Sequence, residues 1–228
     1  MSGKQIKAKS KKTSPWKERQ KFRRAKQPSP VPAPTRRTPN QDTFAELLRQ
    51  HGVLLHGHFL LSSGRHSAQY FEKFRILENP ALCETFAQAL ASRFVDKNPT
   101  VVCGPTTGGV IIAYEVARQL QCRCVIAEKT DSGRKIGRGF KLGPEDRVLV
   151  VDDVMTTGGS LVETLTALDE FPSKVVGVGV FIDRSGGNNK LGQPYSSVYS
   201  QTMETWDPGN CPLCRSGTPL SVPGRGGG

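Results

Sequence analysis

The chain of 228 residues contains no run of about 18 apolar residues, so we expect no membrane-spanning helix. Residues 1–40 lack the apolar stretch of a secretory signal. The dinucleotide-binding pattern G-x-G-x-x-G and the Gly-Lys-Ser/Thr ending of a Walker A loop are missing too, and no segment repeats itself. These absences argue against a membrane protein, an exported protein, a Rossmann dehydrogenase and a P-loop nucleotidase.

Acidic residues are nearly missing from residues 1–40, which hold 13 of the 32 Lys and Arg residues but one of the 20 Asp and Glu residues. The formal net charge of +12 therefore belongs to this segment, and the rest of the chain is neutral. Few apolar residues and a proline-rich stretch at 28–34 predict a disordered tail. Such a tail can contact a polyanion such as nucleic acid, or it can be a solvated extension without a partner.

Cysteine is uncommon, with six residues, and no disulfide framework is expected without an export signal. We therefore expect a cytoplasmic protein, and four of the cysteines lie in apolar patterns typical of buried thiols. Cys211 and Cys214 form a CxxC pair, but a zinc site needs two further ligands and the four histidines lie far upstream in the sequence. We interpret the pair as a structural turn; a metal or redox role, including one between subunits, stays open.

From residue 41 onward, short apolar runs alternate with amphipathic stretches. The alternation predicts an α/β fold with a mostly parallel, doubly wound sheet. Thr43 is expected to cap the first helix, Pro80 to open another, and residues 196–206 to form an edge strand. We assign 41–220 to this domain and 221–228 to a glycine-rich, disordered end.

Two polar loops follow predicted strands, at the edge where open α/β sheets bind ligands. An aliphatic run leads into Asp152 and Asp153, and a loop of small residues, 156–160, precedes the next helix. Backbone N–H groups and hydroxyls at a helix N-terminus suit a phosphate, and the carboxylates suit the hydroxyls of a ribose. The loop Gly104–Gly109 offers a second anion site. Together they predict a site for a sugar phosphorylated at both ends.

The segment Val148–Ser160 resembles the phosphoribosyl diphosphate (PRPP) fingerprint of type I phosphoribosyltransferases. The resemblance implies the fold of that family, with a small hood region, and a catalytic role for Asp153. It implies PRPP contacts by Lys129 and by a continuous run made of Asp152, Asp153, Val154, Met155, Thr156, Thr157, Gly158, Gly159 and Ser160. It also assigns the pyrophosphate half to Thr106, Thr107, Gly108 and Gly109.

Two further stretches resemble orotate phosphoribosyltransferases. Gly57–Ser67 is similar to the F-x-L-x-S-G-x-x-S stretch of that family, and Phe181–Gly187 carries the strand-end Arg184. A guanidinium can form two parallel bonds with a planar carboxylate such as that of orotate, although Arg184 could also form a surface ion pair. The resemblance covers about residues 42–220 and implies orotate contacts by Thr156, Arg184, Ser63, Gly64 and Arg65.

The basic segment Glu128–Gly139 departs from the better-known K-x-x-K-x-H loop of the family. We expect a polar loop that closes over the diphosphate and excludes water. Lys129, Arg134 and Lys135 are candidate catalytic cations, and Arg138 is a further one. Ser62 stands where many family members carry a PRPP-contacting lysine.

These features predict an enzyme that moves the ribose 5-phosphate of PRPP to orotate, giving orotidine 5′-monophosphate and pyrophosphate in pyrimidine biosynthesis. We expect Mg²⁺ as cofactor, held mainly through substrate oxygens. The resemblance further implies a homodimer. Two alternatives stay open: a phosphoribosyltransferase for another base such as a purine, and a PRPP-sensing regulator that binds nucleic acid through its basic tail.

Overall fold

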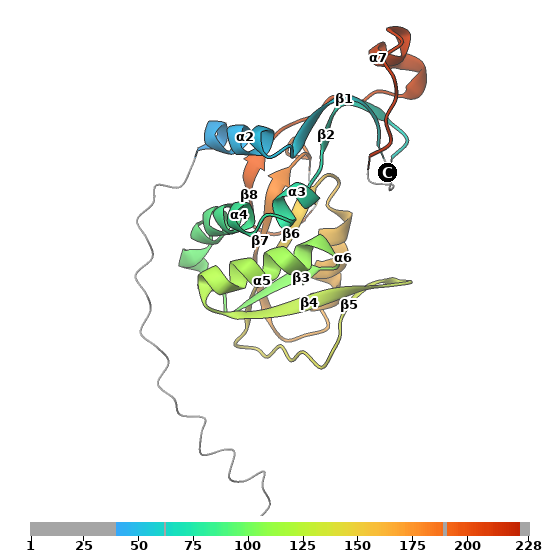
Figure 1. Ribbon diagram of the computed structural model, residues 1–228. Coiled ribbons are helices and arrows are strands. Elements are labelled where there is room, and N and C mark those ends of the chain that lie inside the picture. Colours follow the sequence, from blue (N-terminus) through green and yellow to red (C-terminus); the bar gives the residue numbers. More distant parts are fainter. Residues whose placement is uncertain (1–39, 62, 189–190, 224–228) are drawn as a thin grey trace, which may run out of the picture. The chain divides into compact units, whose positions relative to one another are not determined.

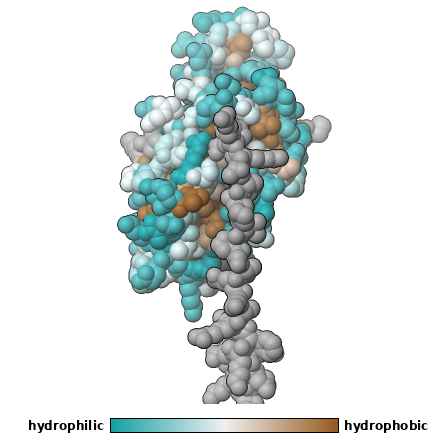
Figure 2. Space-filling view, turned by 90° about the vertical axis from the view of Figure 1, so that its left-hand side faces the viewer, coloured by the Kyte–Doolittle hydropathy of each residue, from teal (hydrophilic) through white to brown (hydrophobic). Residues whose placement is uncertain are grey.

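The computed structural model describes residues 40–61, 63–188 and 191–223 (Figure 1). Residues 1–39 of the predicted tail and the last five glycine-rich residues lie outside the described residues, while Asn40, the last residue of that tail, is described. Within the described ranges, no helix has the length and apolar character needed to cross a membrane. Figure 2 shows one face of the molecule, which is largely hydrophilic with small separate hydrophobic areas.

A six-stranded sheet in the order β5-β4-β3-β6-β7-β8 forms the centre of the described chain. Strands β4, β3, β6, β7 and β8 run parallel, while β5 is antiparallel to β4. Their bounds are Val101–Pro105 (β3), Arg123–Thr130 (β4), Gly133–Ile136 (β5), Arg147–Met155 (β6), Lys174–Asp183 (β7) and Tyr195–Ser200 (β8). The mostly parallel α/β sheet and the edge position of the last strand are confirmed.

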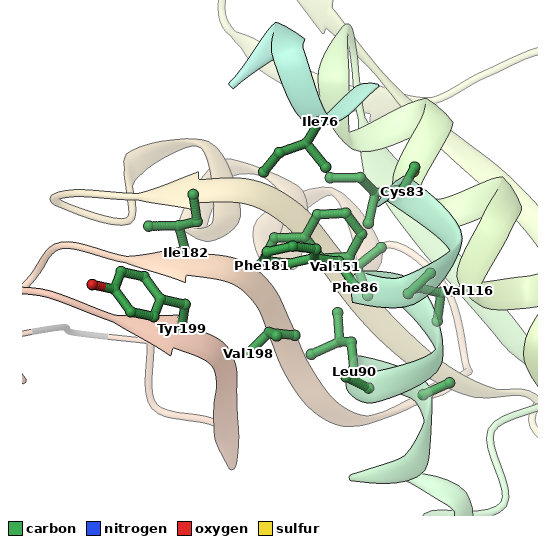
Figure 3. Packing of buried hydrophobic residues seen from close by; sticks show 14 of the residues in the cluster. Ile76, Cys83, Phe86, Leu90, Val116, Val151, Phe181, Ile182, Val198 and Tyr199 are labelled. Carbon is green, nitrogen blue, oxygen red and sulfur yellow. The ribbon is translucent and has the colours of Figure 1, made fainter. Parts of the chain in front are cut away.

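Helices cover both faces of this sheet because residues along each central strand are apolar on both sides. Leu149 and Val151 of β6 pack with α2, α4 and α5, whereas Val148 and Val150 pack with α6. Figure 3 shows Phe86 and Leu90 of α4 against the first face. The helices are Gln41–Gln50 (α2), Phe74–Leu77 (α3), Pro80–Ser92 (α4), Gly108–Leu120 (α5) and Gly159–Leu168 (α6), with short turns at Val95–Lys97 (η1), Pro208–Asn210 (η2) and Pro212–Arg215 (α7).

A small antiparallel hairpin of β1 (Leu54–Leu60) and β2 (His66–Phe71) forms the hood region. Figure 1 places it at one end of the molecule, with α7 beside it. The C-terminal segment joins the hairpin through bridges from Phe59 to Ser221 and from His66 to Trp206. Ser221, which the sequence placed in the glycine-rich end, therefore belongs to the ordered fold.

Two local predictions need correction. Asn40, and not Thr43, caps α2: its side chain accepts a hydrogen bond from the Thr43 N–H at 2.9 Å. Asn is as good a cap as Thr, and the helix begins one turn earlier than the capping-box pattern indicated. The basic segment is also no simple loop, because Gly133–Ile136 pairs with β4 as an edge hairpin.

Candidate active site

Two buried carboxylates lie near the carboxyl end of β6. Asp152 is 8% exposed and Asp153 is 5% exposed. Asp152 Oδ1 accepts a hydrogen bond from the Asp153 N–H, and Asp153 Oδ1 accepts one from the Val154 N–H. Burial, followed by the neighbouring Asp153 charge, raises the pKa of Asp152 to about 6. Holding two acidic side chains together at the end of the strand therefore costs folding free energy.

The loop after these acids ends at an uncapped helix N-terminus. Met155 is buried, Thr156 and Thr157 are exposed, and Gly158 takes a positive φ of 81° just before α6. No side chain caps α6, and none caps α5 after Thr107 in the neighbouring loop. The first N–H groups of both helices are therefore directed toward the ends of β6 and β3, which are neighbours in the sheet. This geometry offers two adjoining anion sites.

Glycines let the β3–α5 loop pass directly against the acid pair. A Cβ on Gly108 would lie 2.0 Å from Asp153 Oδ2, and one on Gly109 would lie 3.0 Å from Asp152 Oδ1. A Cβ on Gly104 would lie 2.1 Å from the Gly109 carbonyl oxygen. The glycines of this loop are thus required by close approach, and not only by the turn itself.

Lys73 is a site residue that the sequence reasoning missed. It stands directly before the short helix α3, after the hood hairpin, and its side chain makes no capping hydrogen bond. Its Nζ lies 2.8 Å from Asp153 Oδ2, and its side chain is 38% exposed. No motif singled it out, because its partner is eighty positions further along the chain. The ion pair stabilises one buried carboxylate and leaves a cation at the mouth of the site.

Arg134, a candidate catalytic cation, ties the two anion loops together. Its Nη1 donates to the Thr106 carbonyl at 3.2 Å, and its Nη2 donates to Ser160 Oγ at 3.0 Å. Its Nε lies 3.4 Å from Glu163 Oε2, and the side chain is 8% exposed. The Arg134 guanidinium therefore holds the two loops in position. In this arrangement it is not available to bind a diphosphate.

The other candidate cations of the hairpin differ in their partners. Arg138 forms an ion pair with Glu128 at 2.6 Å. Lys129 and Lys135 are exposed, and neither forms an ion pair with another residue of the described ranges. The Lys129 N–H donates to Thr106 Oγ1 at 3.2 Å, which joins the start of the hairpin to the pyrophosphate loop. Lys129 is therefore the cation of the hairpin best placed to meet an incoming anion, and Lys135 stays a predicted candidate.

Arg184 follows β7 and lies beside the phosphate loop. Its N–H donates to the Met155 carbonyl at 2.8 Å, so the two strand ends are fixed side by side. Its guanidinium carbon lies 5.8 Å above the Phe71 ring, and burial lowers its pKa. Nε is buried without a hydrogen-bond partner in the described part of the chain, and no surface ion pair forms there. The site thus presents a partly desolvated guanidinium, which suits a carboxylate ligand.

The three hood residues predicted to contact orotate, Ser63, Gly64 and Arg65, differ in their surroundings. Ser63 and Gly64 are exposed in the hairpin turn. Arg65 donates to the Thr205 carbonyl at 2.7 Å and forms an ion pair with Asp207 at 2.6 Å. Within the described ranges, no hydrogen bond or ion pair links these residues to Arg184 or to the acid pair. Ser62 lies outside the described residues.

The sheet order, the acid pair and the two anion loops define the class of phosphoribosyltransferases. Residues 75–210 match the family model described as phosphoribosyl transferase domain. A solved orotate phosphoribosyltransferase from Aeropyrum pernix superposes with a TM-score of 0.60 at 27% identity, covering 69% of this chain and 93% of that chain.

Curated relatives give the particular family. The orotate phosphoribosyltransferase of Caldicellulosiruptor bescii is 44% identical over 185 residues, which cover 81% of this chain and 97% of the relative. That of Thermotoga maritima is 42% identical over 182 residues, covering 80% and 97%. The chain belongs to the orotate phosphoribosyltransferase family.

Proposed function

We propose that the protein transfers the ribose 5-phosphate of PRPP to orotate, forming orotidine 5′-monophosphate and pyrophosphate. One observation carries the proposal: the buried pair Asp152 and Asp153 lies between two uncapped helix N-termini, with Arg184 fixed beside the same loop. The family of the chain and the names of its relatives support the same reaction.

PRPP binding follows from the two loops. The 5-phosphate lies at the N-terminus of α6, where Thr156, Thr157 and Ser160 supply hydroxyls and the backbone supplies N–H groups. The ribose hydroxyls donate to the carboxylates of Asp152 and Asp153, which are acceptors when ionised. The pyrophosphate half lies at the N-terminus of α5. Both ends of the substrate are therefore held while its central C1 carbon stays accessible.

Orotate binding follows from Arg184. Because its guanidinium is partly buried and without an ion pair in the described chain, it gains most by pairing with a carboxylate that arrives with a ligand. The hydrogen bond from the Arg184 N–H to the Met155 carbonyl places this arginine next to Thr156. The base and the sugar thus meet at Thr156, and orotate that arrives as an anion needs no general base.

The chemical step requires charge stabilisation more than proton transfer. As the bond between C1 and the diphosphate breaks, negative charge grows on the leaving group and positive charge on the sugar. Lys129, whose N–H is bonded to the pyrophosphate loop, is the exposed cation on the diphosphate side, Lys135 is a second exposed cation of the same hairpin, and the buried acid pair faces the sugar. These residues lower the barrier by electrostatics in a site that excludes water.

We propose Mg²⁺ as a cofactor bound with PRPP. The carboxylate oxygens of Asp152 and Asp153 are of the type that Mg²⁺ prefers, but the acids do not belong to a group of three or more metal-binding side chains within the described ranges. The described residues therefore do not supply a full set of protein ligands for Mg²⁺. They fit an ion whose ligands come largely from the diphosphate. When bound, such an ion neutralises charge on the leaving group.

We further propose a homodimer. Three large side chains are exposed on the adjacent helices α3 and α5: Phe74 at 51%, Ile111 at 44% and Tyr114 at 68%. A second copy of the chain would remove this apolar surface from water. Analytical ultracentrifugation of the wild type and of Tyr114→Glu tests this: a dimer should become a monomer in the variant.

We also propose the compartment of the protein and a contact made by its N-terminal segment. All six cysteines are free thiols, which supports a reducing compartment such as the cytoplasm. For residues 1–40 we propose a weak contact with polyanions, because this segment carries the whole net charge. A gel shift with nucleic acid at increasing salt, with and without residues 1–40, measures that contact. Orotate turnover at ordinary rates without residues 1–40 would remove the alternative of a regulator.

Turnover with a panel of bases tests the acceptor. The purified protein is incubated with PRPP, Mg²⁺ and either orotate, adenine, guanine or uracil, and pyrophosphate release is measured. We expect release with orotate at least about 100-fold faster than with the other bases, since a site built for a carboxylate rejects analogues that lack it. Release with a purine and none with orotate would contradict the proposal.

Two variants with matched controls test the site. We expect Asp153→Asn and Arg184→Ala to lose most orotate turnover, because each removes a charge that meets substrate. Asp169→Asn and Arg49→Ala change the same residue types at exposed positions and should keep wild-type turnover. Full activity of Arg184→Ala would overturn the assignment of orotate to this arginine.

A further inference from the structure

Four metal-binding side chains converge at the hood, away from the acid pair. They are His58 on β1, His66 on β2, and Cys211 and Cys214 at the short helix α7. One ligand atom from each lies within 4.8 Å of all the others. His58, His66 and Cys211 are buried, while Cys214 is exposed. Figure 1 shows α7 beside the hairpin, so segments about 150 positions apart in the sequence meet here.

The distances between the nitrogen and sulfur atoms come close to those of a tetrahedral site. Cys211 Sγ lies 3.4 Å from His58 Nε2, and Cys214 Sγ lies 3.7 Å from His58 Nε2 and 3.2 Å from His66 Nδ1. The two imidazole nitrogens are 2.9 Å apart. Ligands at the usual Zn–N and Zn–S bond lengths of a tetrahedral site are about 3.3 to 3.8 Å apart. The four atoms are thus already close to the spacing that one ion requires.

The hydrogen bond from His58 to the Thr218 carbonyl orients a nitrogen lone pair toward the centre of the cluster. His58 Nδ1 lies 2.8 Å from the Thr218 carbonyl oxygen, so Nδ1 carries the proton and Nε2 presents a lone pair to the cluster. That lone pair can accept from His66 or from one thiol, but not from all three groups. A carbonyl that orients the far nitrogen of a histidine is a common partner of metal ligands.

We propose that His58, His66, Cys211 and Cys214 bind one structural Zn²⁺ ion. The donor set of two nitrogens and two sulfurs favours Zn²⁺ over Mg²⁺ or Ca²⁺, which prefer oxygen. Four protein ligands complete the tetrahedron, so the ion has no open position for a substrate. The site is distinct from the acid pair and is independent of the proposed reaction.

The zinc ion joins the C-terminal segment to the hood hairpin. Each element supplies ligands, and two bridges, Phe59 to Ser221 and His66 to Trp206, flank the cluster. Arg65, next to His66, holds Thr205 and Asp207 of the same segment. Because the hairpin has only two strands, a cross-link of this kind stabilises an element that is marginal by itself.

Metal analysis of the full-length chain tests the proposal. The protein is purified from cells grown with added Zn²⁺, and its zinc content is measured by mass spectrometry. We expect about one zinc ion per chain in the wild type and less than about a tenth of that in Cys214→Ser. Cys122→Ser, which changes a partly buried cysteine outside the cluster, should keep the full zinc content. Equal zinc content in all three proteins, or none in the wild type, would overturn the proposal.

Cobalt binding and thiol counting cover the possibility that a variant fails to fold. Chelator-treated wild-type protein is titrated with Co²⁺, and we expect the visible bands of tetrahedral cobalt and a sulfur-to-cobalt charge-transfer band, both missing in Cys214→Ser. Thiols are counted in denatured, metal-free protein purified without reductant. Six free thiols per chain are expected from the six cysteines. Four thiols together with an absence of cobalt bands would show a redox pair in place of the zinc site.

Discussion

The Lys73 ammonium lies 2.8 Å from the Asp153 carboxylate, so the end of the hood region is joined to the strand that carries the acid pair. Asp153 is buried, and a buried carboxylate is costly unless it is paired. Because Lys73 remains partly exposed, it can also meet an anionic substrate at the mouth of the site. The ion pair thereby couples the position of the hood to the charge of the sugar site.

Replacing Lys73 should weaken the reaction without unfolding the protein. We expect Lys73→Ala to lower kcat/KM for PRPP by about 10- to 100-fold, because it removes a charge-assisted contact worth about 1.5 to 3 kcal/mol that holds Asp153 in place and faces the anionic substrate. Lys73→Arg should restore most of this loss, and Lys97→Ala, which removes an exposed cation paired with Asp96, should have no effect. Wild-type kcat/KM in Lys73→Ala would contradict a role for the pair.

Arg134 should act by positioning the loops. We expect Arg134→Lys to raise the KM for PRPP about tenfold and to lower the unfolding temperature by a few degrees, since an ammonium cannot span Thr106 and Ser160 as a guanidinium does. Steady-state kinetics and thermal unfolding measure the two effects together.

Lys135→Ala supplies the contrast, because its exposed side chain has no ion-pair partner in the described chain. It should lower kcat and leave the unfolding temperature unchanged. If Arg134→Lys kept wild-type KM and stability while Lys135→Ala had no effect on kcat, both assignments would be wrong.

The parts of the site that the sequence predicted are those encoded locally. The aliphatic run, the acid pair and the glycine-bearing loop are continuous from Val148 to Ser160, and their order along the strand fixes where they lie in the sheet. The alternation of strands and helices predicted a mostly parallel sheet, and the pairing of β3 with β6 in that sheet brings Gly104–Gly109 beside this loop.

The parts that could not be predicted depend on contacts between distant segments. Lys73 meets Asp153 only because the chain returns to the carboxyl end of β6 after the hood hairpin. The histidines that join Cys211 and Cys214 lie about 150 positions upstream, and no spacing rule connects them. The single CxxC by itself therefore predicts a turn and leaves a metal role open, because the two histidines beside it are found only in three dimensions.

Gly108 tests the close approach of the two loops. We expect Gly108→Ala to raise the KM for PRPP by more than about tenfold, because its Cβ would lie 2.0 Å from Asp153 Oδ2 and would displace the carboxylate. Gly143→Ala is the matched control: the nearest atom to its Cβ is Asp146 Oδ2 at 4.0 Å. Both variants are compared by PRPP titration and by thermal unfolding. An unchanged KM in Gly108→Ala would show that the contact has no bearing on substrate binding.

Asp152 links the stability of the protein to pH. Burial raises its pKa from the ordinary 3.8 to about 6, so between these values the folded state binds more protons than the unfolded state. The free energy of unfolding therefore falls as pH rises through this window, and it stays lowered above about 6. Ionisation of Asp152 therefore lowers the stability of the fold.

Asp152→Asn removes that ionisation and keeps an oxygen for the Asp153 N–H. We expect urea unfolding at pH 8 to show the variant about 1 to 3 kcal/mol more stable than the wild type, with the difference nearly gone at pH 4. Exposed Asp169→Asn should show no such pH dependence. Above pH 6, PRPP binding should weaken in Asp152→Asn, because a neutral amide accepts the ribose hydroxyl less strongly than the ionised carboxylate does. A stability difference that is equal at both pH values would contradict the raised pKa of Asp152.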